Sequence, residues 1–570
     1  MNGALQSSLT VADLPPCHSK AFLTLLSPSL QTKARIEEGI IHSPYPDCQV
    51  PSVSLYALLA GRMQRNSDKT AILCQEKAVS HGELLRRFRC ITAGLQSMGL
   101  GRGDRVYARF SSATVDGLAA LCGVMFSGAT LILAGESSED EHLANIRSLD
   151  VTHLLIDSSN ADIFISLLPQ LTLKGKLSVD DTPGFTRVSP FQWEANEAAF
   201  DDDRGSEDDV MMIAYSSGTS GLPKNIELQR RYLMYYVVAT EACEPLPSEE
   251  ICIIGPSITF AVLMYHLKGL YSGAAFVMMG QQGASDLLDS MLRHKVTWFA
   301  SPQFRVLSIA RQVEKRGCGP PPSLRSVVLF GAPVTVTAAR EITATLRPLV
   351  FRNAYGTTET GFVAVPPRGE CAYDNVGFPV PGTRIKVIDM QSGRVLGPMK
   401  EGEVLLHSPA VMKGYYNMPA ETELALDAQG WFHTGDVGMY DENGRLYMVD
   451  RIKCLLVCFS WKVSSCQLED CLLKHPDVAE AAVFGVANEE AGDLPAAVVV
   501  LRSGHENRGE ELAEELMAHV AARHSWYRHH CAGVYVTNAI PKTETGKIRR
   551  RDLAQMLPSL QRLDRTISTA

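Results

Sequence analysis

The segment from Tyr215 to Lys224 concentrates residues that can hold an anion. It reads Tyr-Ser-Ser-Gly-Thr-Ser-Gly-Leu-Pro-Lys, and the apolar run 210–214 before it predicts a strand that delivers a loop. Backbone N–H groups and hydroxyls in such a loop bind phosphate oxygens, and the lysine adds a positive charge. We therefore expect a polyphosphate-binding loop, although a flexible Ser/Gly surface loop has a similar composition. It is not a Walker loop, because no Gly-Lys-Ser or Gly-Lys-Thr ends it. The expected phosphate contacts are Ser216, Ser217, Gly218, Thr219, Ser220, Gly221 and Lys224.

Four further segments follow this loop in order along the chain. They are 353–360 (Asn-Ala-Tyr-Gly-Thr-Thr-Glu-Thr), 430–436 (Gly-Trp-Phe-His-Thr-Gly-Asp), 450–453 (Asp-Arg-Ile-Lys) and 541–547 (Pro-Lys-Thr-Glu-Thr-Gly-Lys). With the loop, they resemble the motifs of the adenylate-forming superfamily, which includes acyl-CoA synthetases, beetle luciferases and the adenylation domains of peptide synthetases. The resemblance covers most of the chain and is to the 4-coumarate:CoA ligase and luciferase-like type.

The resemblance implies a nucleotide-binding role for residues in each segment. The Tyr355 ring is expected to stack on adenine, and Thr358 to hydrogen-bond a phosphate. Glu359 is expected to ligate Mg²⁺, the only metal implied, although alone it would be an ordinary carboxylate near a helix start. Asp436 is expected to accept hydrogen bonds from the ribose hydroxyls, and Arg451 to reach ribose or phosphate; alone they would be a turn residue and a surface ion pair partner. The other ATP-binding residues implied are Gly331, Ala332, Gly356 and Thr357.

Lys547 is the residue on which the implied chemistry depends most. We expect it to stabilise the charge that gathers on the α-phosphate as a carboxylate attacks, an electrostatic role. The alternative is a basic tail, because three arginines, 549–551, follow. With Glu359 and Thr219 it makes up the expected catalytic set. Asp450 and Lys453 are expected to form a hinge that lets the C-terminal part of the chain move.

Three departures from the family pattern bear on the acyl group and its acceptor. Ser460 stands where relatives usually have a glycine that lets a pantetheine arm approach the backbone. Ile258 and Thr259 stand where relatives often have a histidine, and Phe330 precedes Gly331 where a small residue is common. We expect Ile258, Thr259 and Phe330 to line the acid pocket and to favour a smaller or differently shaped acid.

The elements that must position these residues alternate between strand-like and helix-like runs from about residue 54 to 500, which predicts an α/β fold with largely parallel sheets. After residue 430 the pattern is β-rich, with a hairpin signal at 442–444. We expect an N-terminal extension (1–40), a large AMP-binding domain with mostly parallel sheets and a β-rich subdomain (41–449), and a small mobile α+β domain (450–570) that carries the lysine.

Composition limits the possible partners. A chain of 570 residues with 45% hydrophobic and 21% charged residues is typical of a globular protein with several cores. Its net charge of −9 disfavours nucleic acid as a partner.

The uncharged run 117–135 is long enough to span a bilayer, but the turn signal at 127–128 favours a buried helix followed by a strand, so we expect no transmembrane segment. Scattered cysteines favour a reducing compartment. The chain ends Ile-Ser-Thr-Ala rather than with the peroxisomal tripeptide, so we expect a cytoplasmic location; a weak organelle-import signal at the N-terminus stays an alternative.

The function expected from the resemblance is ATP-dependent activation of a carboxylic acid to an acyl-adenylate with release of pyrophosphate, followed by thioester formation with coenzyme A. ATP, Mg²⁺ and coenzyme A are the implied cofactors and co-substrates. One alternative is an adenylation-only or luciferase-like enzyme that uses another acceptor. The other is a non-catalytic nucleotide- or acyl-binding relative. The identity of the acid and the oligomeric state do not follow from the sequence.

Overall fold

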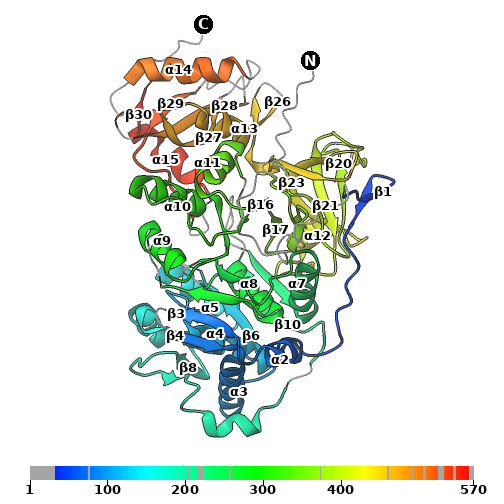
Figure 1. Cartoon of the computed structure of the whole chain (residues 1–570), viewed down its shortest axis with the longest axis vertical. Coiled ribbons are helices and arrows are strands. Elements are labelled where there is room, and N and C mark those ends of the chain that lie inside the picture. The colour runs from blue at the N-terminus through cyan, green and yellow to red at the C-terminus, as the bar shows by residue number, and fades with distance from the viewer. Residues whose placement is uncertain are drawn as a thin grey trace.

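The structure is a computed structural model of the chain. It describes residues 32–74, 77–135, 137–202, 205–215, 224–255, 258–280, 283–332, 334–372, 374–458, 461–488, 492–502, 504, 509–523, 532–543 and 547–563. In Figure 1 the elements near the C-terminus gather at one end of the long axis of the molecule, next to helices α10 and α11. The two largest sheets lie toward the other end. We use "C-terminal unit" for the elements from β25 onward and "N-terminal unit" for those up to β24.

Two mostly parallel sheets form the body of the N-terminal unit. One has eight strands in the order β22-β11-β10-β6-β5-β7-β8-β9, parallel except where β11 meets β10 and β22. Its strands are β22 (Gly414–Tyr415), β11 (Asn225–Gln229), β10 (Val210–Tyr215), β6 (Thr130–Leu133), β5 (Arg105–Arg109), β7 (His153–Ile156), β8 (Gly175–Ser178) and β9 (Thr186–Arg187). The expected strand at 210–214 is therefore confirmed as β10.

The second large sheet has seven strands in the order β16-β15-β14-β12-β13-β3-β4, and only the β3–β4 pair is antiparallel. They are β16 (Val350–Asn353), β15 (Ser326–Leu329), β14 (Trp298–Ser301), β12 (Ile251–Ile253), β13 (Ala275–Met278), β3 (Thr70–Cys74) and β4 (Lys77–Ser80). Because parallel strands need crossover connections, helices separate most of them. The helices of the unit are α2 (Leu55–Arg65), α3 (His81–Ser97), α4 (Val115–Phe126), α5 (Glu139–Ser148), α6 (Ala161–Leu167), α7 (Arg230–Cys243), α8 (Phe260–Ser272), α9 (Ala284–Arg293), α10 (Gln303–Arg316), α11 (Val336–Leu346) and α12 (Pro419–Ala425).

The uncharged run 117–135 lies inside the protein. Every residue of α4 from Gly117 to Phe126 is buried, and the run continues through a turn into β6. Thr114 caps the helix, because its side chain accepts a hydrogen bond from the Gly117 N–H. The helix, turn and strand expected from the sequence are thus confirmed. In the part of the chain that the structure describes, no helix combines the length and the apolar character needed to cross a bilayer.

Smaller antiparallel sheets complete the N-terminal unit. A six-stranded sheet runs β1-β2-β20-β21-β23-β24, and a three-stranded sheet runs β17-β18-β19. The strands are β1 (Arg35–Glu37), β2 (Ile40–His42), β20 (Arg384–Ile388), β21 (Gly402–His407), β23 (Phe432–Tyr440), β24 (Leu446–Arg451), β17 (Tyr355–Thr357), β18 (Gly361–Val365) and β19 (Phe378–Pro379). The hairpin signal at 442–444 is confirmed, because it connects β23 to β24.

The C-terminal unit is an α+β layer with its own core. Strands β26-β25-β28-β29-β30 form a sheet in which β27 also pairs with β28. The elements are β25 (Leu455–Cys458), β26 (Trp461–Ser464), α13 (Ser465–Leu473), β27 (Val478–Asn488), β28 (Gly492–Leu501), α14 (Gly509–Ala521), β29 (Gly533–Val536), α15 (Arg550–Met556) and β30 (Gln561–Arg562). Leu468, Leu472, Val483, Leu512 and Leu516 are among its buried core residues. The expected α/β class, with a smaller α+β part at the C-terminus, is confirmed; the expected domain boundaries stay a prediction.

A buried ionic cluster joins α7, α8 and β16 behind the expected nucleotide site. The Glu244 carboxylate contacts the Arg352 guanidinium and lies 3.4 Å from the Lys268 ammonium, and all three side chains are at most 3% exposed. Burial disfavours the charge of Glu244, but Arg352 and Lys268 hold its pKa below the usual range. Because Arg352 directly precedes the segment 353–360, this cluster fixes the strand end from which that segment leaves.

Candidate nucleotide site

Residues of four segments that are far apart in the sequence face one cavity of about 1630 Å³. Tyr355 and Glu359 come from β17 and the turn after it, Asp436 from β23, Arg451 from the end of β24, and Lys547 from the C-terminal unit. The cavity therefore lies between the two units of the chain, and both contribute charged groups to it.

Asp436 is held by two side chains that line the same cavity. Its Oδ2 accepts a hydrogen bond of 2.6 Å from the Tyr355 hydroxyl, and the Arg451 Nε lies 2.9 Å from its Oδ1. Asp436 and Arg451 are direct partners in the β23–β24 register, so the ladder itself places the ion pair. Burial raises the pKa of Asp436, whereas Arg451 and the Tyr355 hydroxyl lower it, and burial prevails. Each carboxylate oxygen thus has one protein donor and retains a lone pair for another.

Glu359 has an aromatic partner that the sequence motifs did not indicate. The Tyr415 hydroxyl lies 3.3 Å from its Oε1, and the Lys224 ammonium lies 4.3 Å from the centre of the Tyr415 ring. Tyr415 therefore stands between the end of the phosphate loop and the expected metal ligand. Sequence reasoning missed it because it lies 56 residues from Glu359 and in a strand of a different sheet.

The backbone next to Lys547 is held by contacts with residues 542 and 543. Lys542 and Ile548 form an isolated antiparallel bridge, the Thr543 N–H donates to the Lys547 carbonyl at 2.8 Å, and the Lys547 N–H donates to the Thr543 hydroxyl at 3.1 Å. Burial lowers the pKa of the Lys547 ammonium and Arg451 lowers it further, whereas Asp436 and Glu359 raise it. The ammonium thus lies within the electrostatic reach of the three charged groups that line the same cavity.

The other residues expected to contact ATP in this part of the chain line the cavity as well. They are Gly331, Ala332, Gly356, Thr357 and Thr358, together with Asn353 and Ala354 of the same motif. A side chain at Gly356 would place its Cβ 2.1 Å from the Gly361 carbonyl oxygen, so only glycine lets β17 and β18 approach this closely. Thr357 and Thr360 hold the turn between these strands, with 3.0 Å between their hydroxyl oxygens.

The phosphate loop lies mainly outside the described residues. This holds for Ser216, Ser217, Gly218, Thr219, Ser220 and Gly221, and also for Ser460. Tyr215, at the start of the loop, pairs with Asn225, the residue after its end, across the antiparallel β10–β11 ladder. Lys224, next to this pair, lines the cavity.

The hinge residues differ in their surroundings. Asp450 is buried, and its Oδ2 accepts hydrogen bonds from the hydroxyls of Ser464 (2.8 Å) and Ser465 (3.1 Å) and from the Cys466 N–H (3.2 Å). Its carboxylate therefore binds the start of α13, while its backbone belongs to β24. Lys453 is exposed in the single 3-10 turn Ile452–Cys454 that follows and lines the cavity.

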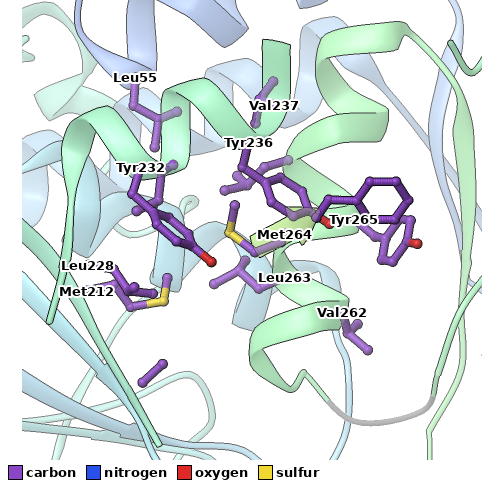
Figure 2. Close-up of a cluster of buried hydrophobic side chains, with 14 of the residues drawn as sticks. Leu55, Met212, Leu228, Tyr232, Tyr236, Val237, Val262, Leu263, Met264 and Tyr265 are labelled. Carbon is purple, nitrogen blue, oxygen red and sulfur yellow. The ribbon is translucent and has the colours of Figure 1, made fainter. Parts of the chain in front are cut away.

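The residues expected to form the acid pocket pack around a cluster of aromatic side chains. Phe330 lies 5.2 Å from Tyr265, measured between ring centres, and Ile258 is buried in the large core. Thr259 caps α8 through a hydrogen bond of 3.5 Å from the Val262 N–H. Figure 2 shows Tyr232 and Tyr236 of α7 and Tyr265 of α8 within a cluster of buried hydrophobic side chains. The described wall of the large cavity does not include Ile258, Thr259 or Phe330. It does include Gly331, the residue after Phe330.

Comparison with known proteins decides the family. Residues 59–416 match the family model described as AMP-binding enzyme, and residues 467–547 match the one described as AMP-binding enzyme C-terminal domain. The chain belongs to the AMP-binding enzyme family. The resemblance to adenylate-forming enzymes inferred from the motifs is thereby confirmed.

Curated relatives of this AMP-binding enzyme include plant ligases and a luciferase. The chain is 27% identical over 558 residues to 4-coumarate–CoA ligase-like 1 of Arabidopsis thaliana, covering 93% of this chain and 99% of the relative. It is 32% identical over 406 residues to 4-coumarate–CoA ligase 1 of Oryza sativa subsp. japonica, covering 67% and 68%. Luciferin 4-monooxygenase of Nipponoluciola cruciata is 32% identical over 358 residues, covering 61% and 64%.

Solved structures share the fold over both units. ATP-bound MatB from Rhodopseudomonas palustris superposes with a TM-score of 0.79 at 23% identity, covering 88% of this chain and 98% of that one. The amide bond synthetase McbA from Marinactinospora thermotolerans superposes with a TM-score of 0.77 at 23% identity, covering 88% and 99%. Because both structures are only 23% identical to this chain, the likeness shows a shared fold and carries no statement about activity.

Proposed function

We propose that this chain condenses a small carboxylic acid with ATP to an acyl-adenylate and pyrophosphate, and then transfers the acyl group to the thiol of coenzyme A. The observation that carries the first step is the meeting of Lys547 with Asp436, Glu359 and Arg451 at one cavity. Burial opposes the charge of a lysine, so placing Lys547 among these groups between the two units is costly unless that charge has a role.

The proposed nucleotide position follows from the groups around Asp436. Each oxygen of this carboxylate retains one acceptor site, which matches the two hydroxyls of a ribose. Gly331, Ala332 and the Tyr355 ring supply a flat surface nearby for adenine. Phosphates that extend from this ribose would point toward Thr358 and Lys224.

The proposed reaction needs charge stabilisation more than proton transfer. A carboxylate oxygen of the acid attacks the α-phosphorus, the bond from that phosphorus to the bridging oxygen breaks, and pyrophosphate leaves. Negative charge grows on the α-phosphate oxygens in the transition state. The Lys547 ammonium and the Arg451 guanidinium are positioned to stabilise it, because both lie among the acids of the cavity.

The residues present fit a magnesium ion held with the phosphates of ATP. Among the described residues, no group of three His, Cys, Asp or Glu side chains forms a complete metal cage. Mg²⁺ is usually bound by one or two carboxylates together with substrate phosphates and water, and Glu359 supplies such a carboxylate. The ion would neutralise phosphate charge, and Tyr415 would orient the carboxylate through its hydroxyl.

Coenzyme A is the acceptor that the curated relatives support, because several of them are named as CoA ligases. Ser460 stands where relatives usually have a glycine, and this departure motivates two alternatives to coenzyme A ligation. One is an adenylating enzyme with another acceptor, and the other is a relative that binds nucleotide without turnover. The retained Lys547, Glu359 and Asp436 favour an active enzyme over the second alternative. The cytoplasmic location stays a prediction.

We also propose that the acid is short, because aromatic side chains fill the space behind Gly331. Phe330 packs on Tyr265, and Tyr236 lies 6.5 Å from Phe362, measured between ring centres. At Gly361 an added Cβ would lie only 2.9 Å from the Tyr236 ring and 3.1 Å from the Tyr232 hydroxyl. A core this dense leaves little room for a long or aromatic acyl chain without displacing a ring.

The test is acid-dependent exchange of labelled pyrophosphate into ATP, run with a panel of short, aromatic and long-chain acids, with and without coenzyme A. Exchange with short acids and thioester formation on adding coenzyme A are the expected results. Exchange without a thioester would overturn the proposed acceptor. Preference for long-chain acids would overturn the proposed substrate size. No exchange with any acid would favour nucleotide binding without turnover.

A further inference from the structure

Helix α13 of the C-terminal unit contacts the beginning of helix α11 of the N-terminal unit through Asp470. The Oδ1 of Asp470 accepts a hydrogen bond of 3.1 Å from the Thr337 N–H. Thr337 is the second residue of α11, so this N–H belongs to the first turn, whose donors have no partner within the helix. A carboxylate also matches the positive end of a helix dipole. Asp470 therefore supplies, from the other unit, an N-terminal contact that α11 cannot make for itself.

Two further polar contacts cross between the units beside Asp470. The Arg311 guanidinium of α10 donates to the Ala479 carbonyl at 3.0 Å and pairs with Glu341 of α11 at 3.1 Å. Arg502, which follows β28, lies 3.7 Å from the other oxygen of Glu341. These contacts surround the Asp470–Thr337 bond, and Figure 1 shows α13 next to α11 at this junction.

Helix α13 also holds the segment that carries Lys547. Glu469, the neighbour of Asp470, is buried; its Oε1 accepts 2.5 Å and 2.9 Å bonds from the Arg550 guanidinium and the Val483 N–H. Arg550 begins α15 only three residues after Lys547 and also donates to the Val483 carbonyl at 3.0 Å. Two adjacent carboxylates of one helix thus connect α11 on one side to the segment after Lys547 on the other.

We infer that Asp470 is a positioning residue for the adenylation step: it holds α13 against α11 and, through Glu469 and Arg550, sets Lys547 at the nucleotide cavity. This inference rests on the proposed function for its kinetic consequence, but not for its structural one. Loss of the contact lets the C-terminal unit leave this orientation without touching the nucleotide, the acid or the lysine itself.

The kinetic test compares Asp470→Ala, Asp470→Asn and Lys474→Ala in the pyrophosphate exchange assay. We expect Asp470→Ala to lower kcat by about fivefold or more, with the KM for ATP within about twofold. Asp470→Asn keeps an oxygen that can accept from the Thr337 N–H, so it should retain more activity than the alanine variant. Lys474 lies 3.0 Å from the other oxygen of Asp470 and contacts it on its own helix, so Lys474→Ala is the matched control and should resemble the wild type.

Small-angle X-ray scattering of the full chain with ATP and Mg²⁺ tests the same contact without turnover. Asp470→Ala should give a larger radius of gyration than the wild type, whereas Lys474→Ala should not. A scattering profile of Asp470→Ala equal to that of the wild type overturns the inference, and so does an unchanged kcat. If the wild type exchanges pyrophosphate with no acid, the proposed function fails, and the scattering comparison alone then decides the role of Asp470.

Discussion

The Tyr355 hydroxyl and the Asp436 carboxylate meet at 2.6 Å, although 81 residues separate them. Both belong to motifs that the sequence assigns to the nucleotide, one to adenine and one to ribose. The structure adds that the first residue orients the second. Because Arg451 holds the other oxygen, the carboxylate plane is fixed before ATP arrives.

Removing the Tyr355 hydroxyl should therefore weaken nucleotide binding while the ring remains. A hydrogen bond to a charged group contributes about 1.5–3 kcal/mol, so Tyr355→Phe should raise the Kd for ATP by roughly tenfold or more in isothermal titration calorimetry. Tyr355→Ala should raise it further because the stacking surface is lost. Tyr535→Phe removes a hydroxyl that donates to the Ala532 carbonyl at 3.1 Å and should leave the Kd unchanged. An equal Kd for Tyr355→Phe and the wild type would contradict the orienting role.

Lys547→Ala should abolish adenylation without preventing ATP binding. Loss of a group that stabilises transition-state charge typically costs about 10²–10³ in rate, so acid-dependent pyrophosphate exchange should fall by that factor. Lys542→Ala is a control from the same segment, because its ammonium pairs with Glu480 at 2.6 Å. Unchanged exchange in Lys547→Ala would remove the assignment.

Replacing Lys547 should leave the stability of the protein without nucleotide unchanged or raise it, although the same change abolishes adenylation. Its pKa in the folded protein lies below the ordinary value of 10.5, so the unfolded chain holds this proton more tightly. The charged lysine therefore costs stability below its folded pKa, and this cost is relieved as the pH rises from the folded pKa toward 10.5. Lys547→Met should melt at an equal or higher temperature than the wild type at pH 7.5, and the difference should shrink toward higher pH. Differential scanning fluorimetry across this range measures it, and a clearly lower melting temperature at pH 7.5 would refute it.

Glu359→Gln should raise the Mg²⁺ requirement. The amide keeps the size of the side chain but loses the charge that attracts a hard cation, so half-maximal exchange should need about tenfold more Mg²⁺. A magnesium titration of the exchange rate checks this. Glu401→Gln, an exposed carboxylate on the same cavity wall, should behave as the wild type. The same magnesium dependence in both variants would argue against Glu359 as the ligand.

Phe330→Ala should widen the range of acids. Removing this ring from its contact with Tyr265 opens space directly behind Gly331, so longer acids should gain kcat/KM relative to short ones by about tenfold. Phe191→Ala changes the same residue type on the surface, where Phe191 is 63% exposed, and should leave the preference unaltered. If the ratio between long and short acids stays constant in Phe330→Ala, this residue does not set the size limit.

Much of the site could be predicted from the sequence because the family motifs are short, ordered and rich in unusual residues. The motifs of Tyr355, Asp436, Arg451 and Lys547 come together at one cavity, as the resemblance implied. Strand alternation likewise predicted the parallel sheets, and the turn at 127–128 correctly separated α4 from β6.

What the sequence could not predict depends on contacts between distant elements. Tyr415 belongs to the edge strand β22, and nothing in its spacing indicates that its hydroxyl reaches Glu359. Asp470 is one of two adjacent acids on α13, and its partner is a backbone N–H, which has no sequence signature. The aromatic packing behind Phe330 depends on side-chain directions that one chain cannot fix.

Asp450 has a consequence for how this enzyme can change shape. Because one carboxylate oxygen accepts three bonds from the start of α13, the helix cannot drift away from residue 450 whatever orientation the rest adopts. Movement is then confined to a few backbone torsions between residues 450 and 454. A joint with so few degrees of freedom would turn the C-terminal unit about one fixed point and not as a freely tethered body.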